Sequence, residues 1–229
     1  MEKIFLGCPV HNREWILPLY LKHIYNIDYP KHNITLCFIL NDSKDRSKEI
    51  LLDFKKSYEA EYREIIVKEI NFNMPDDLRQ NRIKNKIYER LANVRNEFLS
   101  CIKDEDYVFS IDSDILVPKD SLLRLLSHKK DIVSAIVYND PKKKYPNILI
   151  IKNGRITHFI DFPKNSLFEV DITGAVYLLK SEICKKVKYE YHSFGEDVPF
   201  CISAKKLGYK IWCDSSIFCN HVMYPYMLK

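Results

Sequence analysis

Five apolar, strand-like segments in the first half of the chain alternate with amphipathic helical segments, and this order constrains the fold more than any other feature. The apolar segments are residues 4–10, 33–40, 63–70, 106–111 and 131–138. The helical segments between them are residues 13–26, 44–62, 78–102 and 118–128. An alternating β-α-β-α order predicts an α/β fold, with a Rossmann-like, mostly parallel central sheet, helices on both faces and right-handed connections.

The second half of the chain has a less regular pattern. Residues 148–160 predict a hairpin that turns at Asn153 and Gly154, a pair suited to a type I′ turn. Four further elements are expected: strands at 171–180, 209–214 and 216–222, and a helix at 196–208. With 229 residues, no repeat and no linker, the chain predicts a single domain, with a nucleotide-binding half (1–117) and an acceptor and catalytic half (118–229).

Composition excludes several classes of protein. Seven cysteines without a C-x-x-C pair favour free buried thiols in a reducing compartment over disulfides or a zinc site. The first residues lack the pattern of a signal peptide, and no window approaches the ~18 apolar residues of a membrane span. These features predict a cytoplasmic protein, with docking at the inner face of a membrane left open. The net charge of +5 and the short basic run at 141–145 are better explained by solubility and a solvated loop than by nucleic-acid binding.

Polar and charged residues follow three of the predicted strands. The first strand is followed by "HNRE" (11–14), the second by "NDSKD" (41–45) and the fourth by "DSD" (112–114). The carboxyl ends of parallel strands lie at one edge of a sheet, and ligands of open α/β sheets bind there. The three segments are therefore expected to meet in one crevice.

Asp112 and Asp114 are two residues apart in an extended segment and can point at the same place. Two adjacent carboxylates repel each other, which raises at least one pKa unless a cation joins them. A hard divalent cation, Mg²⁺ or Mn²⁺, meets this need through oxygen ligands. The alternative is a solvated turn in which one of the two acids caps the helix that follows Pro118.

The five glycines of the chain are far apart, so the sequence has neither G-x-G-x-x-G nor a P-loop. A dinucleotide-dependent dehydrogenase and a P-loop kinase are therefore disfavoured. A bound diphosphate would have to be held by a metal ion and not by backbone amides.

Two features near the end of the chain add chemistry to this edge. Glu196 and Asp197 stand at the start of a predicted helix, where the helix dipole alone would favour acids. Either could also act as a general base towards a bound hydroxyl. His221 ends the last predicted strand and, beside two acids, could be a third metal ligand, although most histidines on strands are structural.

The order of these motifs resembles the GT-A-fold glycosyltransferases, and most closely glycosyltransferase family 2. The segments that carry the resemblance are "CPVHNRE", "ILNDSKDRS", "NVRNEFL", "FSIDSDILVP", "DITGAVYLLKSEI" and "FGEDVPFCISAKKLGYKIWCDSSIFCNHV", which span nearly the whole chain. The resemblance implies a metal-dependent enzyme that transfers a sugar from a nucleoside-diphosphate sugar to a hydroxyl of a glycan, a lipid-linked or another acceptor.

The resemblance also implies roles for individual residues. Metal ligands would be Asp112, Asp114 and His221, with Asp112 also touching the donor. The nucleotide-sugar would contact Pro9, His11, Asn12, Glu14, Asp42 and Arg95. Asp197, beside Glu196, matches the catalytic base of inverting members.

The sequence departs from the family pattern in two places. The second strand ends in Asn41-Asp42-Ser43-Lys44, where the family usually has two acids followed by Gly-Ser. The Q-x-x-R-W acceptor motif is absent, which fits a non-processive enzyme. Two other functions on the same scaffold remain open at this point: a sugar nucleotidyltransferase, for which the glycine-rich basic signature near the N-terminus is missing, and a non-catalytic module that binds nucleotide-sugars or glycans.

Overall fold

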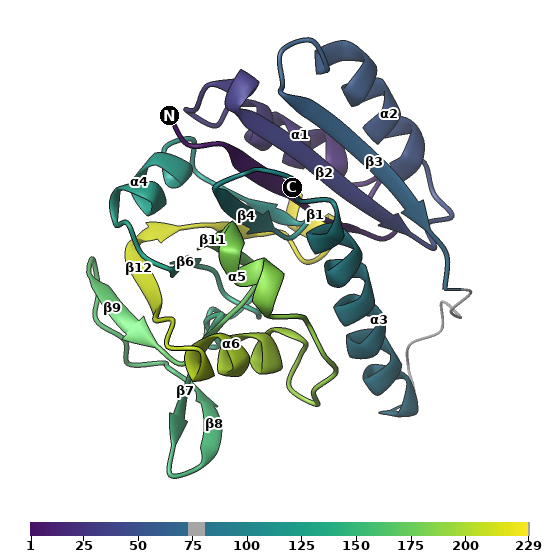
Figure 1. Cartoon of the computed structure of the whole chain (residues 1–229). Coiled ribbons are helices and arrows are strands. Elements are labelled where there is room, and N and C mark those ends of the chain that lie inside the picture. Colours follow the sequence, from purple (N-terminus) through teal and green to yellow (C-terminus); the bar gives the residue numbers. More distant parts are fainter. Residues whose placement is uncertain (73–80, 229) are drawn as a thin grey trace.

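The computed structural model describes residues 1–72 and 81–228, and its centre is an eight-stranded sheet with the order β3-β2-β1-β4-β11-β6-β12-β9 (Figure 1). The strands are β1 (Ile4–Val10), β2 (Ile34–Asn41), β3 (Glu64–Ile70), β4 (Tyr107–Ile111), β6 (Ile132–Ile136), β9 (Leu167–Val170), β11 (Val176–Lys180) and β12 (Ile211–Phe218). Strands β3, β2, β1 and β4 are parallel, as are β6 and β12, while β11 and β9 run antiparallel to their neighbours. The predicted α/β fold with a mostly parallel sheet is confirmed.

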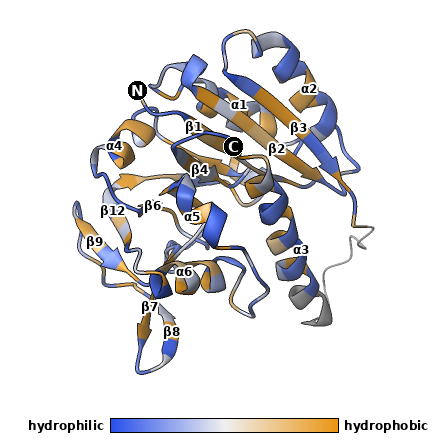
Figure 2. Cartoon of the chain, in the orientation of Figure 1, coloured by the Kyte–Doolittle hydropathy of each residue, from blue (hydrophilic) through white to orange (hydrophobic). Residues whose placement is uncertain are grey.

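Helices cover both faces of this sheet. The helices α1 (Leu17–Tyr25), α2 (Ser47–Tyr58) and α4 (Ser121–Ser127) pack on one face, and α3 (Asn81–Ser100), α5 (Ser181–Lys186) and α6 (Asp197–Lys206) on the other. Two 3₁₀ turns lie at Lys31–Asn33 and Pro225–Leu228. The strands are apolar along most of their length, whereas the helices have a polar outer side (Figure 2), as a sheet covered on both faces requires.

Two small sheets complete the fold. A three-stranded sheet has the order β10 (Ile172–Thr173), β7 (Ile148–Lys152) and β8 (Arg155–His158). In the turn between β7 and β8, Asn153 has φ 52° and Gly154 has φ 72°, the two positive values of the predicted type I′ turn. A two-stranded sheet joins β13 (Asn220–His221) to β5 (Ile115–Leu116), which brings the end of the chain beside the segment that follows β4.

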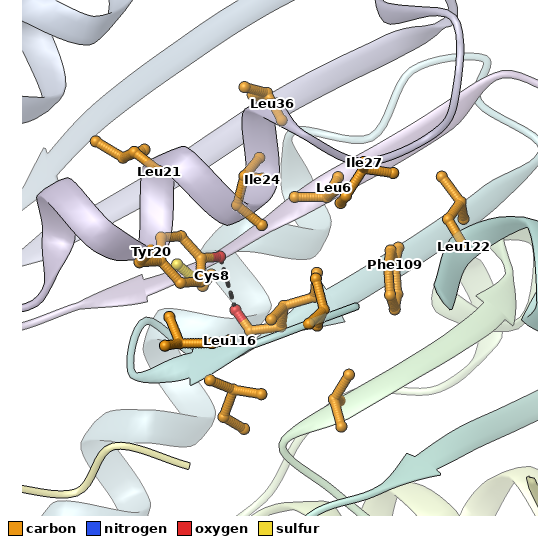
Figure 3. Packing of buried hydrophobic residues seen from close by; sticks show 14 of the residues in the cluster. Leu6, Cys8, Tyr20, Leu21, Ile24, Ile27, Leu36, Phe109, Leu116 and Leu122 are labelled. Carbon is orange, nitrogen blue, oxygen red and sulfur yellow. Dashed lines mark hydrogen bonds between the residues drawn. The ribbon is translucent and has the colours of Figure 1, made fainter. Parts of the chain in front are cut away.

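One core cluster packs around the end of β4, directly before the acidic segment of residues 112–114 (Figure 3). Tyr20 on α1 is fully buried, and its hydroxyl donates to the carbonyl of Ile111, the last residue of β4 (3.1 Å). Neither Asp112 nor Asp114 caps α4, because the N-cap residue of that helix is Asp120. The capping alternative for the two acids is therefore not supported.

Several predicted boundaries are wrong for identifiable reasons. Helix α1 begins at Leu17 and not at residue 13, because Pro18 belongs in a first helical turn. The strand expected at 171–180 is split into β10 and β11 by a turn at Gly174–Ala175. The two closing strands expected at 209–214 and 216–222 are the single strand β12 and the short β13. The expected start of the long helix, residues 78–80, lies outside the described residues.

Candidate active site

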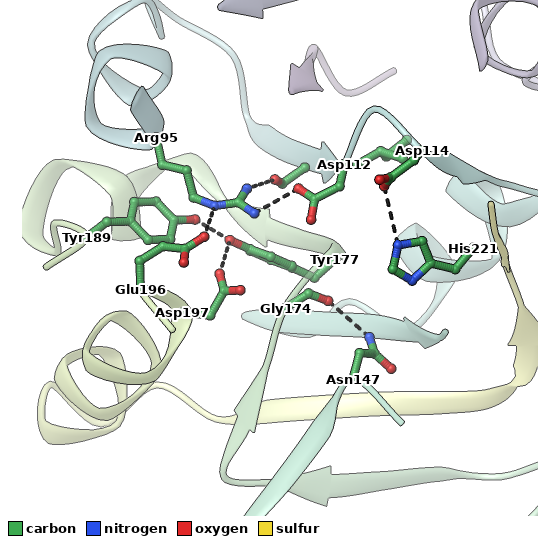
Figure 4. Close-up of polar contacts among 12 residues, drawn as sticks. Arg95, Asp112, Asp114, Asn147, Gly174, Tyr177, Tyr189, Glu196, Asp197 and His221 are labelled. Carbon is green, nitrogen blue, oxygen red and sulfur yellow. Dashed lines mark hydrogen bonds and ion pairs between the residues drawn. The ribbon is translucent and has the colours of Figure 1, made fainter. Parts of the chain in front are cut away.

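A pocket of about 360 Å³ opens at the edge of the large sheet where β1, β2 and β4 end. Its wall includes predicted site residues from both halves of the chain: Pro9, His11, Arg95, Asp112, Asp114, Glu196, Asp197 and His221. The convergence expected from three polar strand ends is thus present, and helix α3, the start of α6 and β13 contribute to the same wall (Figure 4).

The remaining predicted donor residues, Asn12, Glu14 and Asp42, are not part of this wall. Asn12 and Glu14 join the loop after β1 to the loop after β2: the amide of Lys44 donates to Asn12 Oδ1 (2.8 Å) and that of Arg46 to Glu14 Oε2 (2.9 Å). The Asp42 carboxylate accepts from the amide of Phe72 (3.0 Å). These three residues shape the loops that carry the wall, and direct contact with a donor stays a prediction for them.

Arg95 is the central cation of the site. Its side chain is 4% exposed and lies between two acids, donating from Nη2 to Asp112 Oδ1 and from Nε to Glu196 Oε1 (2.7 Å each). Burial lowers the pKa of Arg95, but the charges of Asp112, Asp197 and Glu196 raise it more, so the guanidinium stays charged. Burial raises the pKa of Asp112, and the Arg95 charge opposes that rise. Arg95 therefore compensates acids from two distant segments at once.

Asp114 lies between a second arginine and His221. Arg13 donates from Nη2 to Asp114 Oδ2 (3.0 Å), and the His221 Nε2 atom is 3.5 Å from Asp114 Oδ1. Burial raises the pKa of Asp114, yet the hydrogen bond and charge of His221 and the charge of Arg13 bring it below its ordinary value. Arg13 lies in the predicted strand-end segment, but nothing in the local sequence singled it out from its neighbours.

The ring orientation of His221 is fixed by the backbone. Its Nδ1 atom lies 3.0 Å from the carbonyl of Tyr138, and only a protonated nitrogen can donate to a carbonyl. The Nε2 atom is therefore the one that faces Asp114, as it would in a histidine that ligates a metal through Nε2.

Two carboxylates and one imidazole are a donor set that suits Mn²⁺ or Mg²⁺. Within residues 1–72 and 81–228, however, no three His, Cys, Asp or Glu side chains are arranged to hold a metal ion. Asp112 is turned towards Arg95, and Asp114 is shared by Arg13 and His221. The residue types fit the predicted metal site, and a bound cation would have to replace the arginine contacts of the two aspartates.

Asp197, the first residue of α6, has surroundings unlike those of the other acids in the pocket. Its Oδ1 atom accepts from the Tyr177 hydroxyl (3.4 Å), which also contacts the hydroxyl of Tyr189. The pKa of Asp197 is raised to about 8, mainly because the carboxyl group is enclosed by protein. The charge of Arg95 lowers this pKa, whereas the charges of Glu196 and Asp112 raise it further. Glu196 is held by Arg95, so Asp197 is the better placed of the two for proton transfer.

A tight turn at Gly174–Ala175 seats the Asp197 carboxylate. A Cβ atom on Gly174 would lie 2.2 Å from Asp197 Oδ2, so only glycine fits without displacing the acid. Ala175 has φ 66°, and the amide of Val176 donates to the carbonyl of Gly174 (2.7 Å), which is the strained form of the γ-turn. The amide of Asp112 donates to the carbonyl of Ala175 (2.9 Å). One turn therefore contacts both the acidic segment and the candidate base.

Asn147 holds this turn from the other side. Its side chain is buried and donates from Nδ2 to the carbonyls of Gly174 and Ala135 (3.0 Å each), while Oδ1 accepts from the amide of Val137 (3.0 Å). Gly174, Tyr177 and Asn147 were not predicted as site residues. Their segments were recognised in the sequence, but their contacts with Asp197 and with each other depend on long-range packing.

The architecture and the site define the chain as a domain of the GT-A glycosyltransferase fold. It belongs to the Anp1 family, whose model matches residues 1–169. Among curated proteins, it is 27% identical over 147 residues to a glycosyltransferase 25 family member of Drosophila melanogaster, covering 60% of this chain and 23% of that protein. It is 23% identical over 239 aligned positions to procollagen-lysine,2-oxoglutarate 5-dioxygenase 1 of Gallus gallus, covering 97% of this chain and 30% of that protein. The chain thus spans about a quarter to a third of these relatives.

Solved structures share the fold at low sequence identity. S. aureus TarS in complex with UDP-GlcNAc matches with a TM-score of 0.62 and 16% identity, over 99% of this chain and 61% of that one. The mannosyltransferase PcManGT of Pyrobaculum calidifontis, in complex with GDP-Man and Mn²⁺, matches with a TM-score of 0.62 and 13% identity, over 97% of this chain and 57% of that one. GalNAc-T7 with UDP, GalNAc and Mn²⁺ matches with a TM-score of 0.66 and 13% identity, over 96% of this chain and 44% of that one. These matches confirm the predicted GT-A fold.

In the part of the chain that the structure describes, no helix is both long and apolar enough to span a bilayer.

Proposed function

We propose that this chain is a glycosyltransferase that moves a sugar from a nucleoside-diphosphate sugar to an acceptor hydroxyl. The observation that carries the proposal is the convergence of Asp112, Asp114 and Asp197 in one pocket at the carboxyl edge of the sheet. Membership of the Anp1 family and the nucleotide-sugars bound by TarS and PcManGT support it.

Residues 1–117 supply most of the donor side of the pocket and residues 118–229 the acceptor side and the base. On the donor side, Pro9, His11 and Arg95 would face the nucleotide. Asp112, Asp114 and His221 would hold Mn²⁺ or Mg²⁺, which would neutralise the charge of the diphosphate and so favour its departure. Without a bound cation, Arg13 contacts Asp114 and Arg95 contacts Asp112, and the two guanidinium groups compensate the charges of these acids. This donor chemistry does not require a glycine-rich phosphate loop, in agreement with the lack of one in the sequence.

Asp197 is the proposed general base. In its ionised form the carboxylate accepts the proton of the acceptor hydroxyl as the hydroxyl oxygen bonds to the anomeric carbon. The bond from the anomeric carbon to the phosphate oxygen breaks, and its electron pair leaves with the nucleoside diphosphate. A single displacement of this kind inverts the configuration of the sugar. The hydroxyl of Tyr177 orients the carboxylate through Oδ1, and burial raises the pKa of Tyr177 well above its ordinary value, so this hydroxyl remains a donor.

The acceptor proposed from the sequence is a hydroxyl of a glycan, of a lipid-linked sugar or of another molecule. A cytoplasmic location, contact with the surface of a membrane and the absence of a role in nucleic-acid binding stay predictions. None of them is needed for the chemistry of the pocket.

The proposal is tested by release of nucleotide from a panel of sugars activated with UDP, GDP, dTDP and CMP, with Mn²⁺ and with EDTA. Slow hydrolysis of the donor makes a known acceptor unnecessary. We expect one nucleotide class to be released by the wild type with Mn²⁺, and release to be lost with EDTA and in Asp114→Asn. The exposed residue Asp53 on α2 provides the matched control Asp53→Asn, which should behave as the wild type. Lack of release and of metal-dependent donor binding across the panel would contradict the proposal.

A further inference from the structure

The pocket continues beyond Asp197, away from the ends of β1 and β2, to the three-stranded sheet. Leu149 on β7, His158 on β8 and Ile172 on β10 line this part. Phe194, in the loop before α6, lines it as well, close in sequence to Asp197. In Figure 1, the β7–β8 hairpin and α6 lie together at the end of the molecule opposite to β2 and β3. We call the part lined by Leu149, His158, Ile172 and Phe194 the outer pocket.

Phe194 is a large apolar residue that lies outside the hydrophobic core. It is 63% exposed and belongs to neither of the two core clusters. The loop around it is nevertheless ordered by local contacts: the amide of Phe194 donates to His192 Nδ1 (3.1 Å), and the two rings stack with centroids 5.9 Å apart. A large apolar ring is thus held at the wall of a pocket, with most of its surface available for a ligand.

A second aromatic residue lines the pocket from α3. Tyr88 and Leu91 lie on the same side of this helix as Arg95, because spacings of three, four and seven residues bring side chains together on a helix. With a rise of about 1.5 Å per residue, Tyr88 lies about 10 Å along the helix from Arg95, the partner of Asp112. Tyr88 is therefore displaced from the acidic segment by about the length of two helical turns.

The charges of the pocket are unevenly distributed. Arg13 and Arg95, together with Asp112 and Asp114, lie where a diphosphate would bind. A third arginine of the wall, Arg90 on α3, is 7% exposed. The described lining residues between 139 and 195, which include the whole outer pocket, contain no Lys, Arg, Asp or Glu, and His158 is their single titratable side chain. A phosphorylated or carboxylated acceptor would find no fixed counter-charge among them, whereas an uncharged polyhydroxy compound needs none.

We propose that the outer pocket binds the acceptor as an uncharged sugar whose apolar ring face stacks on Phe194, with one hydroxyl directed at Asp197. The inference rests on the proposed glycosyltransferase function and specifies its acceptor. The C–H groups on one face of a sugar ring carry partial positive charge, and the face of an aromatic ring is negative, so the two attract each other in addition to the apolar area they bury. The hydroxyls at the rim remain free for hydrogen bonds to the pocket wall.

Binding of the acceptor can be measured without any turnover. Saturation-transfer NMR is recorded with methyl glycosides of mannose, galactose, glucose and N-acetylglucosamine, and with the corresponding sugar phosphates. We expect at least one neutral glycoside to bind the wild type and Phe194→Tyr, and to lose about ten-fold in affinity in Phe194→Ala. The control is Tyr226→Ala, because Tyr226 is 61% exposed like Phe194 but does not line this pocket, and it should bind as the wild type.

Turnover separates this inference from the proposed function. Donor hydrolysis without acceptor should be the same in Phe194→Ala and the wild type, while KM for the neutral acceptor rises about ten-fold with kcat nearly unchanged. Equal glycoside binding by the wild type and Phe194→Ala would overturn the inference, as would a preference for sugar phosphates or transfer only to peptide hydroxyls. Failure of donor hydrolysis, by contrast, would overturn the proposed function, and the NMR result would still decide whether the outer pocket binds sugars.

Discussion

Substitution of Gly174 by alanine should displace the proposed base while leaving the donor side intact. The new Cβ atom would lie 2.2 Å from Asp197 Oδ2 and 2.9 Å from its Cγ. Carbon and oxygen atoms that are not bonded approach to about 3.3 Å, so the carboxylate has to retreat by about 1 Å. Gly174 does not have a positive φ, so its backbone can accept alanine without conformational strain. A displacement of about 1 Å in a reacting group costs about 10²-fold in rate.

The assay compares kcat for transfer with the dissociation constant of the donor. We expect kcat of Gly174→Ala to fall about 100-fold, with donor affinity within two-fold of the wild type, since Asp112 and Asp114 are not touched. Gly208→Ala is the control, because Gly208 lies at the end of α6 and its new methyl group would have no atom within 4 Å. That variant should lose about 1 kcal/mol of stability, owing to its φ of 90°, but no activity. An unchanged kcat in Gly174→Ala, or an equal loss of donor binding, would refute the reasoning.

Two further predictions concern the buried charges. Arg95→Met should lower the free energy of unfolding by about 3–5 kcal/mol at neutral pH, because it leaves the buried Glu196 and the half-buried Asp112 without their cation. This loss of stability should be smaller at low pH, because burial raises the pKa of Asp112 and a protonated Asp112 needs no cation. Denaturant titrations at pH 5 and pH 8 would detect the difference, and an equal loss at both would argue against a charge effect. The rate should rise with pH through about 8, because Asp197 must be ionised to act as a base. Because the pKa of Asp197 is raised, the folded protein keeps a proton on this residue at pH values where the unfolded chain has released it. The free energy of unfolding of the wild type should therefore decline between about pH 4 and pH 8. Asp197→Asn should not show this decline and would be the more stable protein at pH 9. A flat pH–rate profile or parallel stability curves would contradict this assignment.

The elements that were correctly predicted from the sequence are those determined by local pattern. Strand β1 was predicted with its observed bounds, and the β7–β8 turn was predicted from Asn153 and Gly154. The convergence of the strand ends also followed, because parallel strands place their carboxyl ends together whatever the details of packing.

The missed features depend on contacts between distant segments. Ala175 adopts a positive φ without being glycine or asparagine, so the break between β10 and β11 had no signal in its own segment. The two-residue strand β5 exists through its pairing with β13, more than 100 residues away in the chain. Helix α5, with six residues, is too short to show a periodic pattern.

The sequence indicated which acids lie together in the pocket, but not which residues pair with them. The sequence indicated that Asp112, Asp114 and Asp197 would share a crevice, but not that Arg13 and Arg95 would neutralise the first two. The partner of a buried acid depends on which helix crosses the sheet beside it, and a single sequence does not specify that. The same reason explains why Gly174 was seen as part of a strand and not as the seat of the Asp197 carboxylate.

The central claim is that one pocket supplies both a donor site and a separate base. The most direct test is to measure donor binding and transfer together in Asp197→Asn, with Asp53→Asn as the control. The account predicts that Asp197→Asn binds the nucleotide-sugar and Mn²⁺ as the wild type does, while transfer falls by about 10²- to 10⁴-fold. Transfer that persists at the wild-type rate in Asp197→Asn, or donor binding that is lost with it, would contradict the claim.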